Sequence, residues 1–323
     1  MQLNNSIKED WENAGSHVPV LADELTGLLD PQPQDTIIDG TFGAGGHARR
    51  LAQSLGQDAL FIGIDRDPVA GRYFELFAQY QPFRCRFIQG NFADAFQELA
   101  DKEFEADLIY LDLGVSSMQL DRPERGFSYS YNAPLDMRMD PDSKVTARQI
   151  VNEWPPEELA RIFKAFGEER YARQIARRIA SERQQAPLET TLQLVDTIKA
   201  AIPTPARFGA GHPARRIFQA LRIAVNDELS SLSQGLENAF EVLAPGGRMA
   251  VISFHSLEDR IVKKFFAARI GKCTCPPDLP KCVCKAKAQL RIITRRPVTP
   301  SVAEMSANPR SQSAKLRVVE KLR

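Results

Sequence analysis

Short runs of apolar residues, separated by segments with helical periodicity, constrain the fold of this chain more than any other feature. The runs span residues 36–39, 59–65, 85–88 and 107–112, and residues 68–80 form a clear helical pattern between two of them. Strands that alternate with helices in this way are typical of βαβ units. The sequence therefore predicts an α/β fold built on a parallel sheet.

Three of these runs end in an aspartate, namely Asp39, Asp65 and Asp112. The carboxyl ends of parallel strands meet at one edge of a sheet, and folds of this class bind their ligands at that edge. We therefore expect the three carboxylates to gather around a binding site.

The first run leads into a glycine-rich loop, residues 39–47, with the sequence Asp-Gly-Thr-Phe-Gly-Ala-Gly-Gly-His. Clustered glycines let backbone N–H groups and a helix N-terminus approach a ligand, because no Cβ atoms stand in the way. Asp65, twenty positions after Gly45, stands where nucleotide-binding folds place the carboxylate that accepts hydrogen bonds from ribose hydroxyls. Loop and acid together predict an adenosine-bearing cofactor.

The loop alone leaves two cofactors open, since it also fits the dinucleotide pattern of nicotinamide-dependent oxidoreductases. Their cofactor carries an anionic pyrophosphate, which an acid at Asp39 disfavours unless that side chain faces away. S-adenosylmethionine instead has cationic sulfonium and amino groups, which suit a site bordered by Asp39, Asp65 and Asp112. The acids therefore favour S-adenosylmethionine and methyl transfer.

The alternation of strands and helices stops after Asp112. Residues 114–141 have a loop-like composition, residues 147–201 indicate helices only, and the α/β pattern returns with one long helix at about 214–243 and a strand at 248–254. Ser256 and Asp259 form an expected capping box, and runs at 290–294 and 315–319 are expected to close the sheet as a pair. We expect a discontinuous sheet domain, 1–120 and 213–323, interrupted by an all-helical domain, 121–212.

The charge is unevenly distributed along the chain. From Arg260 to Arg323 there are 16 Lys and Arg against three acids, so this tail carries +13 and the remainder −12. A basic tail indicates a nucleic-acid partner, and a solvated charged surface is an equally good interpretation. A group of arginines within residues 158–179, set among apolar residues at helical spacing, allows the same two interpretations.

The composition also bears on compartment and metals. No apolar stretch approaches the length of a membrane helix, and residues 1–16 lack the pattern of a secretory signal, so we expect a cytoplasmic protein. Four cysteines, Cys273, Cys275, Cys282 and Cys284, do not have the usual spacing of a zinc site. We expect a reduced surface loop and no metal, with zinc as the alternative. The sequence does not indicate the oligomeric state.

Motifs along nearly the whole chain carry a family resemblance. They include the glycine loop, Leu111-Asp-Leu-Gly-Val-Ser-Ser117, Glu124-Arg-Gly-Phe-Ser128 and Val251-Ile-Ser-Phe-His-Ser-Leu-Glu-Asp-Arg260. In these the chain resembles the bacterial small-subunit ribosomal RNA (cytosine-N4)-methyltransferases of the MraW type. The resemblance implies a Rossmann-like, S-adenosylmethionine-dependent sheet with an inserted helical substrate-recognition domain. It implies methylation of the N4 amine of one cytidine in the decoding region of small-subunit ribosomal RNA. We expect the assembled small subunit as the partner, and the sequence leaves naked RNA open as the alternative.

The resemblance also implies the site residues. Carried over by position, the cofactor contacts are Gly45, Gly46, His47, Asp65 on the ribose, Phe92 beside the adenine, Asp112 and Gln119. The cytosine amine is a poor nucleophile, because its lone pair is delocalised into the ring, so it needs alignment and a hydrogen-bond acceptor. Asp112 is the candidate catalytic residue, together with the nearby Ser116 and Ser117. A loop-capping role for the two serines is equally possible. Methyltransferases that act on nucleobase amines commonly have an acid or amide followed by two prolines at this strand end, and this chain departs from that motif.

The expected substrate contacts are Arg125, Phe127 and Arg138, which lie where the inserted domain leaves the sheet. Arginine can anchor phosphate and an aromatic ring can stack a flipped base, although an ion pair between Arg138 and Asp136 is the structural alternative. In the tail, Arg310, Lys315 and Arg317 are expected to face the RNA. Three further histidines lack metal-ligand spacing and are expected to be structural, namely His17, His212 and His255. A non-catalytic RNA-binding assembly factor is the competing interpretation of the whole chain.

Overall fold

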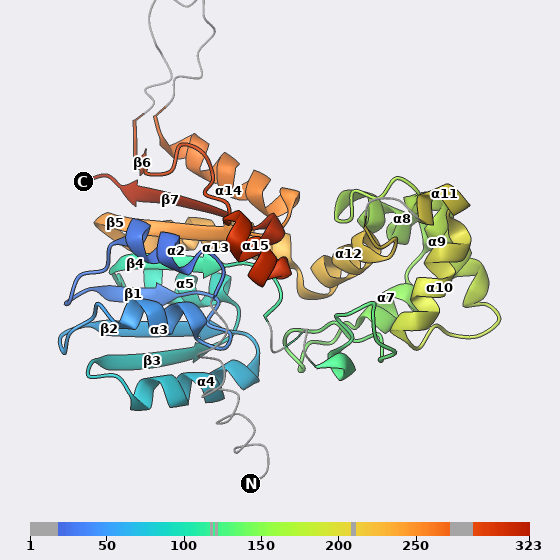
Figure 1. The fold of residues 1–323 in the computed structure, drawn as a ribbon, viewed down its shortest axis with the longest axis horizontal. Helices are drawn as coiled ribbons and strands as arrows, with labels where there is room; N and C mark the ends of the chain where they lie inside the picture. The colour runs from blue at the N-terminus through green and yellow to red at the C-terminus, as the bar shows by residue number, and fades with distance from the viewer. Residues whose placement is uncertain (1–18, 117–118, 120–121, 208–210, 272–286) are drawn as a thin grey trace, which may run out of the picture. The chain divides into compact units, whose positions relative to one another are not determined.

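The computed structural model describes residues 19–116, 119, 122–207, 211–271 and 287–323. The chain divides into two compact units (Figure 1). The sheet unit comprises Met1–Gly114 and Leu229–Arg323, and the helical unit comprises Val115–Glu228. Each unit has its own hydrophobic core.

The sheet unit is built on a seven-stranded sheet with the strand order β3-β2-β1-β4-β5-β7-β6. Its strands are β1 (Thr36–Asp39), β2 (Leu60–Asp65), β3 (Arg84–Gln89), β4 (Ala106–Asp112), β5 (Leu243–Ser253), β6 (Leu290–Ile292) and β7 (Lys315–Lys321). Strands β1 to β5 are parallel, whereas β7 runs antiparallel to both β5 and β6. The predicted α/β class and the terminal strand pair are confirmed.

Helices cover both faces of the sheet. On one face lie α2 (Ala22–Leu29), α3 (Gly46–Ala52) and α4 (Pro68–Gln79), and on the other lie α5 (Phe92–Ala100), α13 (Glu228–Val242) and α14 (Ser256–Arg269) (Figure 1). A short helix α15 (Val302–Ala307) and a 3-10 helix η3 (Pro309–Ser313) precede β7. The two apolar faces of the strands are thereby buried, as a nearly continuous apolar strand sequence requires.

Local side-chain caps start several helices directly after the strands. Asp67 accepts a hydrogen bond from the Val69 amide at the start of α4, and Asn91 accepts one from the Ala93 amide at the start of α5. Pro68 at the first helical position adds a backbone angle that suits a helix start. These caps make the chain turn sharply at the carboxyl edge of the sheet, where the acids of the strand ends lie.

The helical unit contains six α-helices among its described residues. They are α7 (Ala147–Glu153), α8 (Pro156–Ala165), α9 (Ala172–Glu182), α10 (Thr191–Ala201), α11 (Thr204–Arg207) and α12 (Arg215–Asn226), and a 3-10 helix η2 (Pro123–Arg125) precedes them. Thr146 and Thr190 begin α7 and α10 with capping boxes. The helices bury a common apolar core, so the expected all-helical insertion has a packing interior of its own.

The helical unit extends to Glu228, whereas the sequence predicts a boundary at residue 212. The difference arises because α12 buries Ile217, Phe218 and Leu221 in the core of the helical unit. The single helix expected at 214–243 is therefore wrong. It divides into α12 and α13 at Asp227, whose backbone is left-handed, with φ of 48°.

The helical pattern across residues 158–179 is likewise divided between α8 and α9. The connection contains Gly167, where an added Cβ would lie 2.5 Å from the Arg216 carbonyl oxygen. Real Cβ atoms do not approach backbone so closely, so α12 passes too near for any other residue at this position.

In the part of the chain that the structure describes, no helix combines the length and the apolarity that a membrane crossing requires.

The space around two helical glycines predicts opposite effects on stability when each is replaced by alanine. A Cβ at Gly235 of α13 would lie 2.3 Å from the Phe92 ring, whereas a Cβ at Gly27 of α2 meets nothing within 4 Å. We expect Gly235→Ala to lower the free energy of unfolding by about 1–3 kcal/mol through overpacking. Gly27→Ala should raise it by about 0.5–1 kcal/mol, because alanine restricts the unfolded chain. Urea unfolding of both variants measures this, and equal effects would contradict the packing.

Candidate functional site

The carboxyl edge of the three central strands brings the predicted acids together. Asp39 at the end of β1 is in register with Tyr110 of β4 on one side and Gly63 of β2 on the other. Asp65 ends β2, and Asp112 ends β4. The strand order reverses between β1 and β4, and a parallel sheet binds its ligand at such a switch point.

The glycine-rich loop crosses this edge from β4 to β2. The Gly40 amide donates to the Tyr110 carbonyl (3.0 Å), and the Phe42 amide donates to the Ile64 carbonyl (2.9 Å). Gly45 has φ of 75°, and an added Cβ would lie 2.7 Å from the Phe42 ring, so both conformation and space require glycine. Helix α3 begins at the next residue, so the amides of Gly46 and His47 have no intrahelical acceptor.

Asp65 fixes the loop to β2. Its Oδ2 accepts a hydrogen bond from the Gly43 amide (2.7 Å), and its Oδ1 accepts one from the Asp67 amide (2.8 Å). Burial raises the pKa of Asp65 to about 6, although these two amide hydrogen bonds act in the opposite direction. Each carboxylate oxygen has a further lone pair, so Asp65 can still accept hydrogen bonds from a ligand.

Asp39 faces into the protein. It is only 1% exposed, accepts a hydrogen bond from the Tyr110 hydroxyl (2.5 Å) and accepts a second from the Thr41 amide (3.0 Å). Burial raises the pKa of Asp39 to about 7, although both hydrogen bonds lower it. Asp39 is therefore enclosed by the protein and hydrogen-bonded internally, and its place beside the ligand stays a prediction.

Asp112 differs from the other two acids, because one of its oxygens is left free. Its amide donates to the Thr41 hydroxyl oxygen (2.6 Å), which fixes the backbone at the end of β4. Its Oδ1 is buried and has no hydrogen-bond partner among the residues described. Since a buried polar atom without a partner is costly, this oxygen indicates the position of a ligand.

His47, at the start of α3, has the same property. Its Nε2 lies 3.4 Å from Asp112 Oδ2, and its ring packs edge-on against Tyr110. The side chain is 6% exposed, and neither ring nitrogen has a hydrogen-bond partner within the described part of the chain. His47 and Asp112 thus present unsatisfied donor and acceptor atoms side by side at the switch point.

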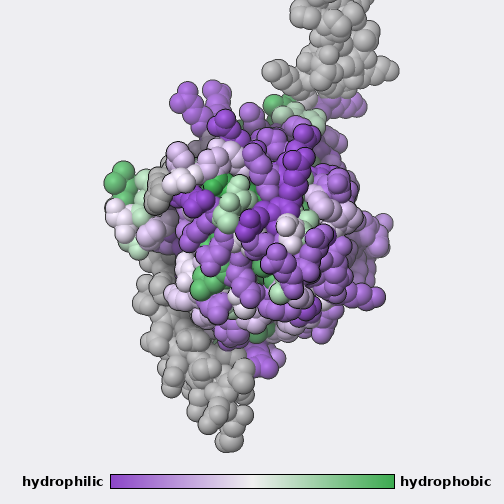
Figure 2. Space-filling model, turned by 90° about the vertical axis from the view of Figure 1, so that its right-hand side faces the viewer, coloured by the Kyte–Doolittle hydropathy of each residue, from purple (hydrophilic) through white to green (hydrophobic). Residues whose placement is uncertain are grey.

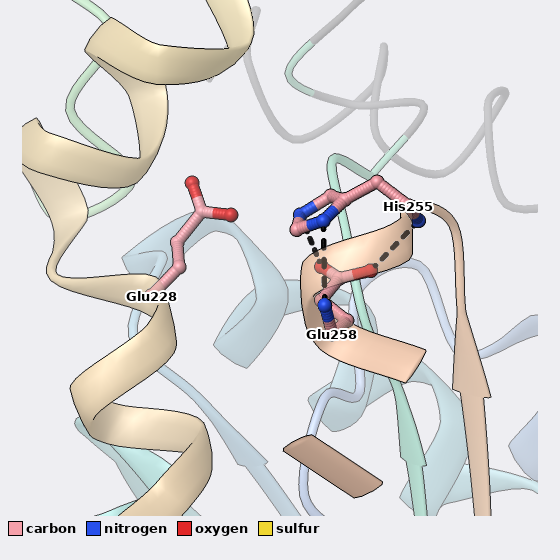
Figure 3. Close-up of side chains that lie close together, drawn as sticks. All are labelled: Glu228, His255 and Glu258. Carbon is pink, nitrogen blue, oxygen red and sulfur yellow. Dashed lines mark hydrogen bonds and ion pairs between the residues drawn. The ribbon is translucent and has the colours of Figure 1, made fainter. Parts of the chain in front are cut away.

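The strand beside β4 ends in a second polar motif, shown in Figure 3. His255 caps α14: its Nδ1 accepts from the Glu258 amide (3.4 Å), and Glu258 Oε2 accepts from the His255 amide (3.2 Å). The expected capping box of Ser256 and Asp259 is wrong, because the helix begins one residue earlier and histidine takes the role usually given to serine. Glu228, also drawn, accepts two hydrogen bonds from Arg222.

Comparison with known proteins identifies the family. The sequence model of the MraW methylase family matches residues 14–322. The chain belongs to this family. A relative from Heliobacterium mobile named ribosomal RNA small subunit methyltransferase H is 51% identical over 309 residues, covering 95% of this chain and 99% of the relative. A relative of the same name from Symbiobacterium thermophilum is 52% identical over 310 residues, covering 95% and 96%.

Among solved structures, an rRNA methylase from Streptococcus thermophilus aligns with a TM-score of 0.41 and 10% identity, covering 94% of each chain. That likeness is too slight to bear on function. Membership of the MraW methylase family, shown by sequence, confirms the expected methyltransferase class with S-adenosylmethionine as its cofactor. The nicotinamide-dependent oxidoreductase and the non-catalytic assembly factor are wrong as classes for this chain.

Two other residues expected at the cofactor lie in contrasting surroundings. Phe92 is the first residue of α5 and is 9% exposed, with its ring against Gly235. Gln119, in the helical unit, is buried and accepts a hydrogen bond from the Ser116 amide (3.2 Å). The Ser116 amide thus makes a local loop contact, whereas its buried Oγ has no hydrogen-bond partner among the described residues. Ser117 lies outside the described residues. The cofactor roles of Phe92 and Gln119 stay predictions.

The residues expected to grip the nucleotide have partners within the helical unit. Arg125 donates to the carbonyls of Arg138 and Met139 (2.9 and 3.0 Å), and Phe127 is part of the buried core. Arg138 donates to both oxygens of Asp136 (2.9 and 2.8 Å), the alternative weighed from the sequence. Although burial alone raises it, the pKa of Asp136 is lowered by the hydrogen bonds and charge of Arg138. These contacts fold the segment between η2 and α7.

Part of the basic tail is also paired internally. Arg317 and Lys315 of β7 lie 2.7 and 3.5 Å from the carboxylate of Asp259 on α14. These ion pairs join α14 to β7. The expected contact of Arg317 and Lys315 with RNA stays a prediction, and their observed partner is Asp259. His17 and the four cysteines considered for zinc lie outside the described residues.

The buried carboxyl of Asp39 predicts a specific pH dependence of stability. Its pKa is about 7 in the folded protein and near the ordinary 3.8 when unfolded, so the folded state holds the proton more tightly. Stability should therefore fall as pH rises from about 4 to 7 and then level off, a loss on the order of 4 kcal/mol. In Asp39→Asn this component should be absent. Urea unfolding between pH 4.5 and 8 measures it, with the exposed Asp58→Asn as control; parallel curves for wild type and Asp39→Asn would refute it.

Proposed function

We propose that this protein transfers a methyl group from S-adenosylmethionine to the N4 amine of a specific cytidine in the decoding region of small-subunit ribosomal RNA. The observation that carries the proposal is the pair of His47 and Asp112 at the switch point of a methylase-family sheet. The two side chains lie 3.4 Å apart, and among the described residues neither Asp112 Oδ1 nor the His47 ring has a hydrogen-bond partner. The names of the relatives, ribosomal RNA small subunit methyltransferase H, support the RNA substrate.

The residues at the carboxyl edge suit this cofactor chemically. When bound, S-adenosylmethionine supplies an electrophilic methyl group and presents an ammonium, a carboxylate and ribose hydroxyls to the protein. Asp112 Oδ1 is an acceptor suited to a cation, His47 offers a ring N–H, and Asp65 has free lone pairs for hydroxyls. Gly45, Gly46, Phe92 and Gln119 complete the proposed set of cofactor contacts.

Asp112 is the proposed catalytic residue. The N4 amine must be aligned with the electrophilic carbon, and an acceptor for one of its hydrogens makes its nitrogen lone pair more available. The Thr41 hydroxyl holds the Asp112 backbone at 2.6 Å, so the carboxylate starts from a fixed position. A preorganised acceptor needs no reorganisation when the reaction occurs.

The substrate is proposed to be the assembled small subunit in the cytoplasm. The proposed contacts with this substrate lie in the segment of the helical unit that follows η2. That segment is shaped by Arg125, Phe127 and Arg138. Because the guanidinium of Arg138 already donates to Asp136 and to the carbonyls of Pro141 and Ser143, its role in the proposal is to hold that segment. Mapping N4-methylcytidine in ribosomal RNA from cells with and without this protein tests the target.

Substitution of the unsatisfied pair tests the cofactor site. We expect Asp112→Asn and His47→Ala each to weaken binding of S-adenosylhomocysteine about 10- to 100-fold, because a charge-assisted hydrogen bond contributes about 1.5–3 kcal/mol. Titration calorimetry measures the affinity, with Asp58→Asn as a matched surface control. Unchanged affinity in both variants would remove the pair from the site. A fall in kcat for Asp112→Asn at saturating cofactor would in addition support its catalytic role.

A further inference from the structure

Helix α9 of the helical unit has two chemically distinct faces. Ala172, Ile175, Ala176 and Ile179 are buried in the core, while arginines cover the outer face. Figure 2 views the side of the molecule on which α9 and α10 lie in Figure 1, and the residues that face the viewer are predominantly hydrophilic. The partners of the individual arginines show which of them are committed to the fold.

Two arginines at this helix have structural partners. Arg178 forms an ion pair with Glu182 one turn later, and Arg183 donates to the Val151 carbonyl (2.8 Å). By contrast, Arg173 and Arg177 are exposed and have neither an ion pair nor a hydrogen bond in the described structure. Arg170, just before the helix, is exposed, and its guanidinium carbon lies 5.7 Å from the centre of the Tyr171 ring. Arg170, Arg173 and Arg177 are called the arginine face below.

The arginine face is unfavourable for the helix itself. Arg173 and Arg177 are four residues apart on α9, so two like charges lie on one side of the helix and repel, and Arg170 precedes the helix by two residues. Arg173 stands in the first turn, at the positive end of the helix dipole, and α9 has no acid in that turn. Helix α8 has the favourable arrangement, with Glu157 and Glu158 in its first turn and Lys164 in its last. The charges of Arg173 and Arg177 therefore do not stabilise α9.

A bound polyanion would relieve both sources of repulsion. Arginine matches phosphate better than lysine does, because its planar guanidinium donates two parallel hydrogen bonds. Backbone phosphates accept such contacts without regard to sequence, and they set the position of a protein on an RNA. The basic tail is partly neutralised by Asp259, whereas Arg173 and Arg177 remain available.

We propose that the arginine face of α9 docks on the ribose-phosphate backbone of the small-subunit ribosomal RNA. This inference rests on the proposed function for the identity of the RNA. Docking here positions the substrate and contributes affinity, and it takes no part in the chemical step. The arginine face should therefore affect KM for the RNA substrate and its salt dependence.

The test compares Arg173→Gln/Arg177→Gln with a matched control, Arg84→Gln/Arg86→Gln. The control removes the same charge from two exposed arginines of β3 in the sheet unit. Glutamine has nearly the helix propensity of arginine, so α9 should stay folded, which an unchanged affinity for S-adenosylhomocysteine and an unchanged Tm would show. Arg173→Lys/Arg177→Lys keeps the charge and should retain most of the affinity.

We expect the α9 variant to raise KM for unmethylated small subunits about tenfold at 0.1 M salt, with kcat preserved at saturation. The slope of log affinity for ribosomal RNA against log salt should decrease by about 2, because two phosphate contacts are lost. An unchanged KM and slope, or an equal loss in the β3 control, would overturn the proposal. Weaker binding to subunits with unchanged binding to bare ribosomal RNA would also overturn it, since a ribosomal protein would then be the partner.

RNA binding is measured separately from methyl transfer, so the two proposals fail in different ways. If the proposed function is wrong, wild-type protein does not methylate small subunits, while the RNA affinity of the variants still reports on the arginine face. If only the docking proposal is wrong, wild type and the α9 variant methylate subunits with the same KM.

Discussion

Hydrogen bonds between the end of β1 and the end of β4 hold the whole carboxyl edge of the sheet together. Asp39 accepts from the Tyr110 hydroxyl and from the Thr41 amide, and the Thr41 hydroxyl accepts from the Asp112 amide. The glycine loop is thereby fixed to β4 at the switch point of the sheet. The position of Asp112, and through it the proposed chemistry, depends on this connection.

The three aspartates at this edge show how environment separates the roles of one residue type. Asp39 is enclosed and bonded internally, and Asp65 fixes the loop while keeping lone pairs at a half-buried surface. Of the three, only Asp112 has a buried oxygen that no other described residue hydrogen-bonds. Carboxylates that support the backbone can thus be distinguished from one that is available to a ligand. Their partners likewise distinguish the arginines: Arg138 is hydrogen-bonded within the helical unit, whereas Arg173 and Arg177 have no such partners in the described structure.

Much of the fold follows from local pattern, and much of the site does not. Strands β1, β2 and β4 are predictable, because uninterrupted apolar runs of this length are stable only inside a sheet. The inward orientation of Asp39 is not, since its partner Tyr110 lies 71 residues away in the sequence. The break at Asp227 was equally hidden, because helical periodicity continues across it and only the competing cores of the two units separate α12 from α13.

The sequence by itself determined the α/β class, the helical insertion, the family and the residues that end the strands, because periodicity and motifs are local properties of the chain. Tertiary structure alone decided which of those residues are free. Whether Asp112, His47 or Arg173 has a partner depends on side chains from distant segments, and the free energy of a buried or exposed charge depends on that partner. The atoms available to a ligand therefore depend on the packing of the whole sheet edge and not on the local sequence.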